Sequence, residues 1–282
     1  MRLFRRTVAA ALFAALLGAT ARAEVSGSPD VLVLGDSQLS FGAGVAFVDF
    51  VNRLAGDCGL PVSSKAGVIG VRSSTLLSWT GRTRSAKGPI CDLDPKWKVN
   101  AGAYGTLSPG ENPYVQIGKG GQFQFCQPER SPLQAVFDGG YYRPRLLIMF
   151  LLGNATERWA ASPAAALQDA RAFVADLPPG QPCIFMTSAP PFGEKVVRLR
   201  QQAQDNIARA FAATGRRCSF VPGLTPETIR ENQGNAANFR RKASGMVKDA
   251  FHPTEAAARR FLRLQKTALC RAIAAQLRPD SG

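Results

Sequence analysis

The chain has 282 residues, a formal net charge of +15 at pH 7, six cysteines and a single histidine. Its length is enough for one α/β domain with a sizeable core. One histidine, with no two cysteines within five residues of each other, excludes the usual ligand clusters of a zinc site. No metal and no organic cofactor is indicated.

Residues 1–23 have the pattern of a secretory signal peptide. Arginines at positions 2, 5 and 6 precede an apolar run at 8–19, and the small-residue segment Ala-Arg-Ala follows at 21–23. The apolar run is too short for a permanent membrane anchor. We therefore expect a mature domain at 24–282 without an integral membrane segment, either periplasmic or secreted.

Export changes the interpretation of the cysteines and of the charge. In an oxidising compartment, an even number of cysteines predicts disulfide bonds. For a basic exported chain we expect the anionic cell envelope, with its polysaccharides and lipid head groups, as the partner rather than nucleic acid. A generally solvated basic surface without a specific partner is the alternative.

Five short apolar runs bounded by breaking residues predict buried parallel strands. These runs lie at 31–37, 61–68, 145–154, 183–190 and 218–223. Helical patterns lie between and after them, at 43–55, 162–177, 194–214 and 253–277. The alternation of strand and helix predicts a doubly wound parallel sheet in a single α/β domain.

Residues 80–143 interrupt this alternation. They contain glycine, proline and aromatic residues without a helical period, and "YVQIGKGGQFQF" at 114–125 alternates apolar and polar residues on both sides of Lys-Gly-Gly. That alternation is typical of a β-hairpin. We interpret this segment as a β-rich insertion between the second and third core strands, which either flanks a site or is decorative.

Small and polar residues follow the predicted strands. In open α/β sheets, ligands bind outside the carboxyl ends of the strands. The first strand ends at a serine, the second runs into a glycine and an arginine, the third ends at an asparagine, and a long polar loop precedes the last helix. The residues in question are Ser37, Gly70, Arg72, Asn154, Asp249 and His252.

These residue types fit nucleophilic catalysis. A serine hydroxyl becomes a good nucleophile when a neighbouring base takes its proton, and a neutral histidine suits that task. Asp249 precedes His252 by three residues, so one turn lets its carboxylate hold the imidazole ring. The backbone N–H groups of Ser37 and Gly70, with the amide of Asn154, would donate hydrogen bonds to the developing oxyanion.

In this order the blocks resemble the SGNH (GDSL-type) hydrolase superfamily, and they span 31–254. The matching residues are Gly35-Asp36-Ser37, Gly70, Asn154 and Asp249-x-x-His252. The resemblance implies that Ser37 is the nucleophile, His252 the base and Asp249 its orienting carboxylate. It also implies an oxyanion hole made by Ser37, Gly70 and Asn154, in a flavodoxin-like three-layer α/β/α fold.

The sequence departs from the family pattern at two places. The third block reads Leu152-Gly153-Asn154-Ala155 where the family usually has Gly-x-Asn-Asp, and Lys65 stands where a second-block asparagine is common. A Gly-x-Ser-x-Gly elbow is missing, which argues against an ordinary α/β-hydrolase.

These features predict an exported serine esterase that acts on short acyl esters, such as acetyl esters, of a small molecule or a glycan. An O-acyltransferase acting on envelope polysaccharide and a non-catalytic envelope-binding protein are the alternatives. Arg72 either pairs with an anionic substrate or lies on the surface. Trp79, like Trp97, either stacks on a sugar ring or packs within the insertion.

The fold also predicts how the cysteines pair. Cys183 and Cys218 begin consecutive strands, which lie side by side in this fold. Cys58 follows the first helix and Cys270 lies late in the last one, and these helices share one face of a flavodoxin-like sheet. The predicted disulfide pairs are Cys58–Cys270, Cys91–Cys126 and Cys183–Cys218.

Overall fold

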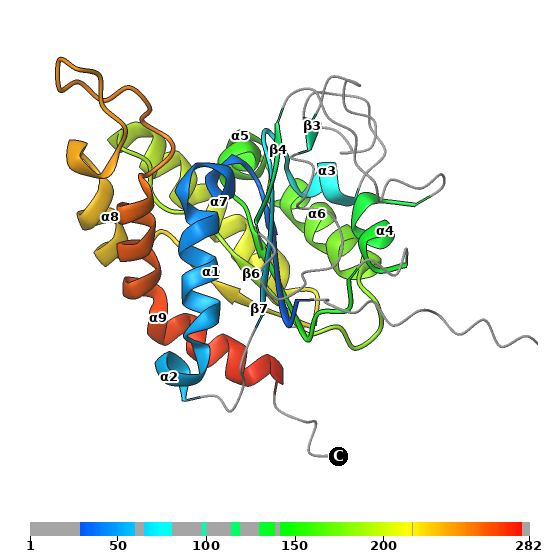
Figure 1. Cartoon of the computed structure of the whole chain (residues 1–282). Coiled ribbons are helices and arrows are strands. Elements are labelled where there is room, and N and C mark those ends of the chain that lie inside the picture. The colour runs from blue at the N-terminus through cyan, green and yellow to red at the C-terminus, as the bar shows by residue number, and fades with distance from the viewer. Residues whose placement is uncertain are drawn as a thin grey trace, which may run out of the picture.

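The computed structural model describes residues 29–59, 65–80, 98–99, 114–118, 130–138, 142–215 and 217–277. In these parts of the chain, a seven-stranded sheet runs in the order β3-β4-β2-β1-β5-β6-β7 (Figure 1). The strands are β1 (Val31–Gly35), β2 (Ala66–Val71), β3 (Lys98–Val99), β4 (Tyr114–Gly118), β5 (Leu146–Phe150), β6 (Cys183–Met186) and β7 (Cys218–Val221). Their pairings are parallel except for the antiparallel contact of β3 with β4.

Helices cover both faces of this sheet, as Figure 1 shows for α1 and α9 on one side and α3, α4 and α6 on the other. The first layer contains α1 (Gly44–Asn52), α2 (Leu54–Cys58) and α9 (Glu255–Leu277). The second contains α3 (Leu76–Thr80), α4 (Pro132–Asp138), α5 (Thr156–Ala161), α6 (Pro163–Asp176) and α7 (Glu194–Ala212). A further helix, α8 (Pro226–Asn232), packs beside α9.

Alternation along the strands divides the hydrophobic core into two layers. In β1, Leu32 and Leu34 belong to the core under α3 to α7, whereas Val31 and Val33 belong to the core under α1 and α9. Successive side chains of a strand point to opposite faces, so a strand buried on both faces is apolar at every position. This explains why the core strands appear in the sequence as continuous apolar runs and confirms the predicted three-layer α/β/α fold.

The predicted core elements are present, but their bounds differ. The strands predicted at 145–154 and 183–190 are shorter than expected and end at Phe150 and Met186, and the helix predicted at 43–55 is divided into α1 and α2. The second strand ends at Val71 instead of 68, because Ile69 and Val71 continue the buried apolar run. The last helix begins at Glu255 instead of 253, after Thr254 accepts a hydrogen bond from the backbone N–H of Ala257.

Two described strands lie within the predicted insertion at 80–143, together with the helix α4, which was not predicted from the sequence. β4 extends the main sheet beside β2, and β3 pairs with β4 at the edge. The predicted return strand of the hairpin, at 122–125, lies outside the described residues, as does the predicted signal peptide. No helix in the described part is long and apolar enough to span a bilayer.

Two of the three predicted disulfides are present in the structure. Cys183 and Cys218 face each other in the register of β6 and β7, and Cys58 at the end of α2 bonds to Cys270 in α9. Cys91 and Cys126 lie outside the described residues, so their pairing stays a prediction.

The bond between Cys58 and Cys270 joins positions 212 residues apart, and so it restricts the unfolded chain strongly. We expect the double variant Cys58→Ala/Cys270→Ala to lose about 2–4 kcal/mol of unfolding free energy. Denaturant titration of the oxidised proteins measures the loss. Peptide mapping that finds Cys58 or Cys270 joined to another cysteine would contradict the assignment.

Candidate active site

Ser37 lies where the chain leaves β1 and enters a helical segment. Residues 37–38 begin this segment, which continues through η1 (Leu39–Ala43) into α1. Beside it, Asp36 Oδ1 accepts a hydrogen bond from the backbone N–H of Gln38 at 2.8 Å. This bond fixes the turn and leaves the serine at the carboxyl edge of the sheet.

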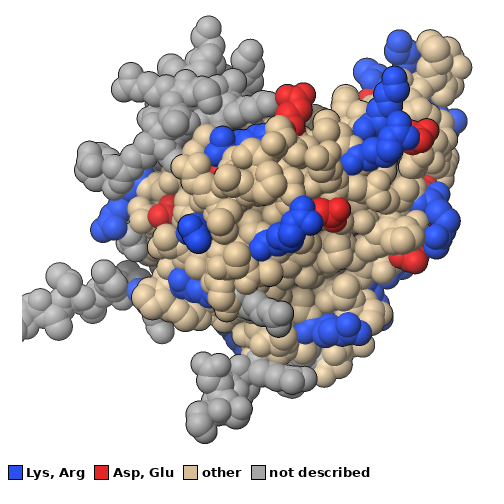
Figure 2. All heavy atoms as spheres, turned by 180° about the vertical axis from the view of Figure 1, so that it is seen from behind, with Lys and Arg blue, Asp and Glu red and all other residues tan. Residues whose placement is uncertain are grey.

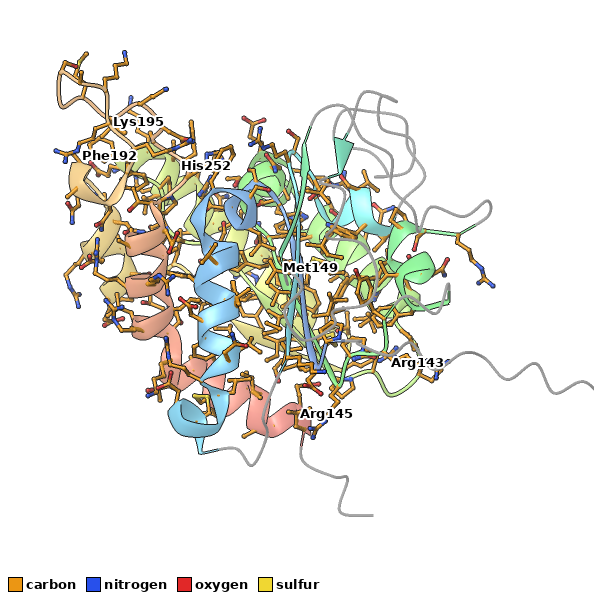
Figure 3. The ribbon with its side chains drawn as sticks, in the orientation of Figure 1. Arg143, Arg145, Met149, Phe192, Lys195 and His252 are labelled. Carbon is orange, nitrogen blue, oxygen red and sulfur yellow. A yellow bond between two sulfur atoms is a disulfide. The ribbon has the colours of Figure 1, made fainter. Side chains whose placement is uncertain are left out.

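The loop that precedes α9 brings the histidine to the same edge. The carbonyl of Ala250 accepts a hydrogen bond from the N–H of Phe192 at 2.8 Å, and the carbonyl of Phe251 accepts one from Gln38 Nε2 at 2.5 Å. The second bond ties the loop to the residue that follows the serine. Figure 3 shows His252 near one end of the sheet, with Met149 in the core between the layers.

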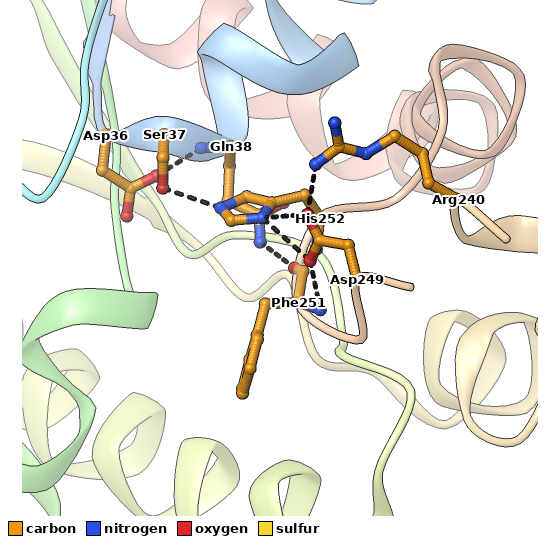
Figure 4. Close-up of polar contacts among 7 residues, drawn as sticks. All are labelled: Asp36, Ser37, Gln38, Arg240, Asp249, Phe251 and His252. Carbon is orange, nitrogen blue, oxygen red and sulfur yellow. Dashed lines mark hydrogen bonds and ion pairs between the residues drawn. The ribbon is translucent and has the colours of Figure 1, made fainter. Parts of the chain in front are cut away.

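A continuous series of hydrogen bonds links three of the predicted site residues (Figure 4). Ser37 Oγ lies 2.8 Å from His252 Nε2, and His252 Nδ1 lies 3.0 and 2.9 Å from the two carboxylate oxygens of Asp249. The carboxylate also accepts hydrogen bonds from the backbone N–H of Phe251 at 3.0 Å and from the guanidinium of Arg240. Its orientation is therefore fixed from several directions.

The surroundings favour a neutral imidazole beside an ionised carboxylate. Burial lowers the pKa of His252 below its usual 6.5, and the charges of Arg200 and Arg240 lower it further, although Asp249 acts in the opposite direction. Burial alone would raise the pKa of Asp249, but hydrogen bonds from Phe251, His252 and Arg240 outweigh it and lower this pKa to about 2. At neutral pH the imidazole can accept a proton.

A second carboxylate lies beneath the serine. Burial raises the pKa of Asp36 to about 6. The hydrogen bond from the N–H of Gln38 and the charge of Arg200 act in the opposite direction, because both favour the ionised carboxylate. A Cβ at position 153 would lie 3.0 Å from Arg200 Nη2 and 3.8 Å from Asp36 Oδ2. Gly153, the displaced glycine of the third block, thus leaves room for this arginine beside the carboxylate.

A cavity of about 550 Å³ opens next to the serine. Its walls include Ser37, Arg72, Asn154, Arg200, Phe251 and His252. Asn154 Nδ2 donates a hydrogen bond to the carbonyl of Ser74 at 3.1 Å, which fixes the side-chain amide at the cavity wall. An amide NH₂ has two hydrogens, so a second donor position remains for a ligand.

Gly70, predicted as an oxyanion donor, lies inside β2 and does not line this cavity. Its carbonyl accepts a hydrogen bond from Ser40 Oγ at 3.2 Å. A Cβ at position 70 would lie 2.9 Å from Ser40 Oγ and 3.0 Å from Leu39 Cβ. The glycine therefore lets the segment after Ser37 pack closely against β2.

The structure separates the two predicted substrate-binding residues. Arg72, for which two alternatives were left open, follows β2 and lines the cavity. Trp79 is fully buried in the core beneath α3, so its side chain packs and is not available for stacking on a sugar. Trp97 lies outside the described residues.

Several residues of the site were not predicted from the sequence, and Arg240 and Phe41 are two that contact the proposed base or its carboxylate. Arg240 precedes Asp249 by nine positions, and only the folding of the intervening loop brings its guanidinium to the carboxylate. The ring centroids of Phe41 and His252 lie 4.5 Å apart. The guanidinium carbons of Arg72 and Arg240 each lie 4.5 Å from the centroid of the Phe41 ring. Neither residue occurs at a motif spacing.

No family model matches the sequence, and no curated protein matches it. Solved structures that align with most of the chain include the C-terminal catalytic domain of peptidoglycan O-acetyltransferase A from Streptococcus pneumoniae, with 14% identity, 88% of this chain and 96% of that chain covered, and a TM-score of 0.42. Clostridium thermocellum family 3 carbohydrate esterase aligns with 14% identity, coverages of 86% and 98%, and a TM-score of 0.42. AlinE4, an SGNH-hydrolase family esterase, aligns with 16% identity, coverages of 88% and 98%, and a TM-score of 0.38. SGNH-hydrolase family proteins are thus among the structures that this chain resembles, but likenesses at this level assign it no activity or substrate.

The single histidine makes the charge state of the site directly measurable. In a protein without a histidine tag, the imidazole signals in proton NMR belong to His252 alone, and we expect them to titrate below pH 6.5. The Arg240→Gln variant removes a positive charge, so it should raise this pKa. A midpoint at or above 6.5 in the unaltered chain would contradict the described environment.

Proposed function

We propose that this chain is a serine ester hydrolase of the SGNH type that removes a short acyl group, such as acetyl, from a carbohydrate. The observation that carries this proposal is the hydrogen-bonded series from Asp249 through His252 to Ser37, which ends at an open cavity. Nucleophile, base and orienting carboxylate lie in the order that acyl transfer requires.

In the first step, Ser37 Oγ attacks the ester carbonyl while its proton passes to His252 Nε2. Asp249 keeps the other ring nitrogen protonated and stabilises the imidazolium that forms. When the tetrahedral intermediate collapses, the bond to the sugar oxygen breaks and that oxygen takes the proton from His252 Nε2. The acyl group is then bonded to Ser37 Oγ.

In the second step, a water molecule gives a proton to His252 Nε2 and attacks the acyl carbonyl. The proton then returns to Ser37 Oγ as the carboxylic acid leaves. A sugar hydroxyl in place of the water would give acyl transfer, with the same proton movements. Hydrolysis and transfer therefore differ in the acceptor, and analysis of the products with excess acceptor sugar separates them.

Negative charge on the carbonyl oxygen needs donors that are already in place. We infer that the backbone N–H of Ser37 and the amide of Asn154 supply them, because both residues line the cavity. For Gly70 we infer an indirect role, since it allows the segment after Ser37 to pack against β2.

We further infer that the protein works outside the cytoplasm. The bonds Cys58–Cys270 and Cys183–Cys218 support an oxidising compartment. A signal peptide at 1–23 fits that location.

Replacing the proposed nucleophile or the proposed base should remove most esterase activity while the fold survives. We expect the double variant Ser37→Ala/His252→Ala to be hardly slower than either single variant, because the residues act as a unit. Ser40→Ala is the matched control, since Ser40 lies in the same segment but does not line the cavity. Hydrolysis of p-nitrophenyl acetate and labelling by a fluorophosphonate probe measure the effect. An active Ser37→Ala protein, or an unaltered chain that resists the probe, would overturn the proposal.

The amide of Asn154 offers a separate test of the oxyanion site. If it binds charge that appears only in the transition state, Asn154→Ala should lower kcat by about 10²–10³ and change KM much less. Steady-state kinetics on any accepted ester give both constants. A loss of kcat below about tenfold would mean that backbone donors suffice and that this amide only holds the loop through Ser74.

A further inference from the structure

Arg72 is a cation in the cavity wall without a carboxylate partner in the described part of the chain. Its Nε is buried and has no hydrogen-bond partner there. The other two arginines of the site differ in this respect. Arg240 pairs with Asp249, and the charge of Arg200 acts on Asp36.

An aromatic ring holds this guanidinium in place. Its carbon lies 4.5 Å from the centroid of Phe41, and the same ring contacts His252, whose Nε2 reaches Ser37 Oγ. A guanidinium that stacks on an aromatic face keeps its planar donors free for an anion. The cation is therefore positioned near the proposed nucleophile without being neutralised.

The charge and the space of the cavity suit one small anionic group. The cavity of about 550 Å³ has the size of a small-molecule site. Its wall also contains Glu157, but this carboxylate is exposed and forms no ion pair with Arg72. One unpaired arginine matches a singly charged carboxylate, which its fork of donors can bind with two hydrogen bonds.

We propose that Arg72 binds a carboxylate of the substrate, so that the ester attacked by Ser37 belongs to an acidic molecule. This inference rests on the proposed esterase function and narrows its substrate class. The carboxylate can belong to the sugar, as in an acetylated uronic acid, or to the acyl group, as in a succinyl ester.

Positive charge also gathers near the site on the loop that leads to Asp249. Arg240, Arg241, Lys242 and Lys248 are exposed on this loop, and Figure 2 shows Lys and Arg gathered on a protruding part of the surface. The positive potential of this loop attracts anionic substrates in general, but it does not distinguish one anionic group from another. Specific recognition is therefore assigned to Arg72 inside the cavity.

Two matched substrate pairs test this assignment and identify the source of the carboxylate. Acetylated methyl glucuronide is compared with acetylated methyl glucoside, and p-nitrophenyl hemisuccinate with p-nitrophenyl butyrate. In one pair we expect a kcat/KM preference for the acidic member, and Arg72→Gln should lower that preference by about tenfold or more. Arg72→Lys should restore part of it, because lysine keeps the charge but loses the planar fork.

Arg241→Gln is the control for a general loss of positive charge, because Arg241 lies on the exposed loop and does not line the cavity. It should change the preference by less than about twofold. Thermal melting confirms that each variant is folded. An unchanged preference in folded Arg72→Gln, or a preference of the unaltered chain for the neutral member of both pairs, would overturn the inference while leaving the esterase proposal intact.

If no ester is turned over in a Ser37-dependent manner, the proposed function fails and binding still tests Arg72. Calorimetry with methyl glucuronide and with succinate then measures carboxylate binding directly. Binding that Arg72→Gln weakens by about tenfold supports the carboxylate site. Absence of binding by the unaltered chain rejects it.

Discussion

The hydrogen bond between Ser37 Oγ and His252 Nε2 joins residues 215 positions apart, and the described architecture brings them together. A parallel sheet places the carboxyl ends of its strands at one edge, so the serine after β1 lies beside the loops that follow the other strands. The hydrogen bond from Gln38 Nε2 to the carbonyl of Phe251 then fixes the position of the loop that carries His252 relative to that edge. The nucleophile and the base are thus held by neighbouring residues of the same two segments.

Burial is the main reason why the pKa of His252 is lowered, and the charges of Arg200 and Arg240 lower it further. Each of these arginines has a carboxylate that compensates its charge, Asp36 and Asp249 respectively. Removing either carboxylate would leave a cation close to the imidazole. Asp249 therefore has two tasks, because it orients the ring and also compensates Arg240. Arg72 has no carboxylate partner in the described part of the chain, so we assign the compensating negative charge to the ligand.

The sequence predicted the layers of the fold and the residues that meet at the sheet edge, since both follow from apolar periodicity and from strand topology. Two disulfides followed from the same topology. The sequence placed Gly70 at the end of its strand, beside the cavity, but Gly70 lies inside β2 against a packed segment. The sequence did not show this because the end of the strand was not known. It also gave no sign of Phe41 or Arg240, whose contacts depend on the path of loops and on side-chain rotamers. For Trp79 it left two alternatives. Burial excludes stacking on a sugar, but the side chain packs in the main core beside strands β1 and β2 instead of only within the insertion.

The buried carboxylate of Asp36 lowers the stability of the folded chain when it is ionised. Its pKa is raised from 3.8 to about 6, chiefly by burial, so between these values the folded chain binds a proton that the unfolded chain has released. The contribution of this group to stability therefore falls as pH rises from about 4 to about 6, and stays low above that. The pKa of His252 is lowered below 6.5, so at neutral pH its imidazole can act as a base. The fold accordingly keeps an ionised, buried carboxylate beneath the serine at the pH at which the site can work, and Arg200 and the N–H of Gln38 limit its cost.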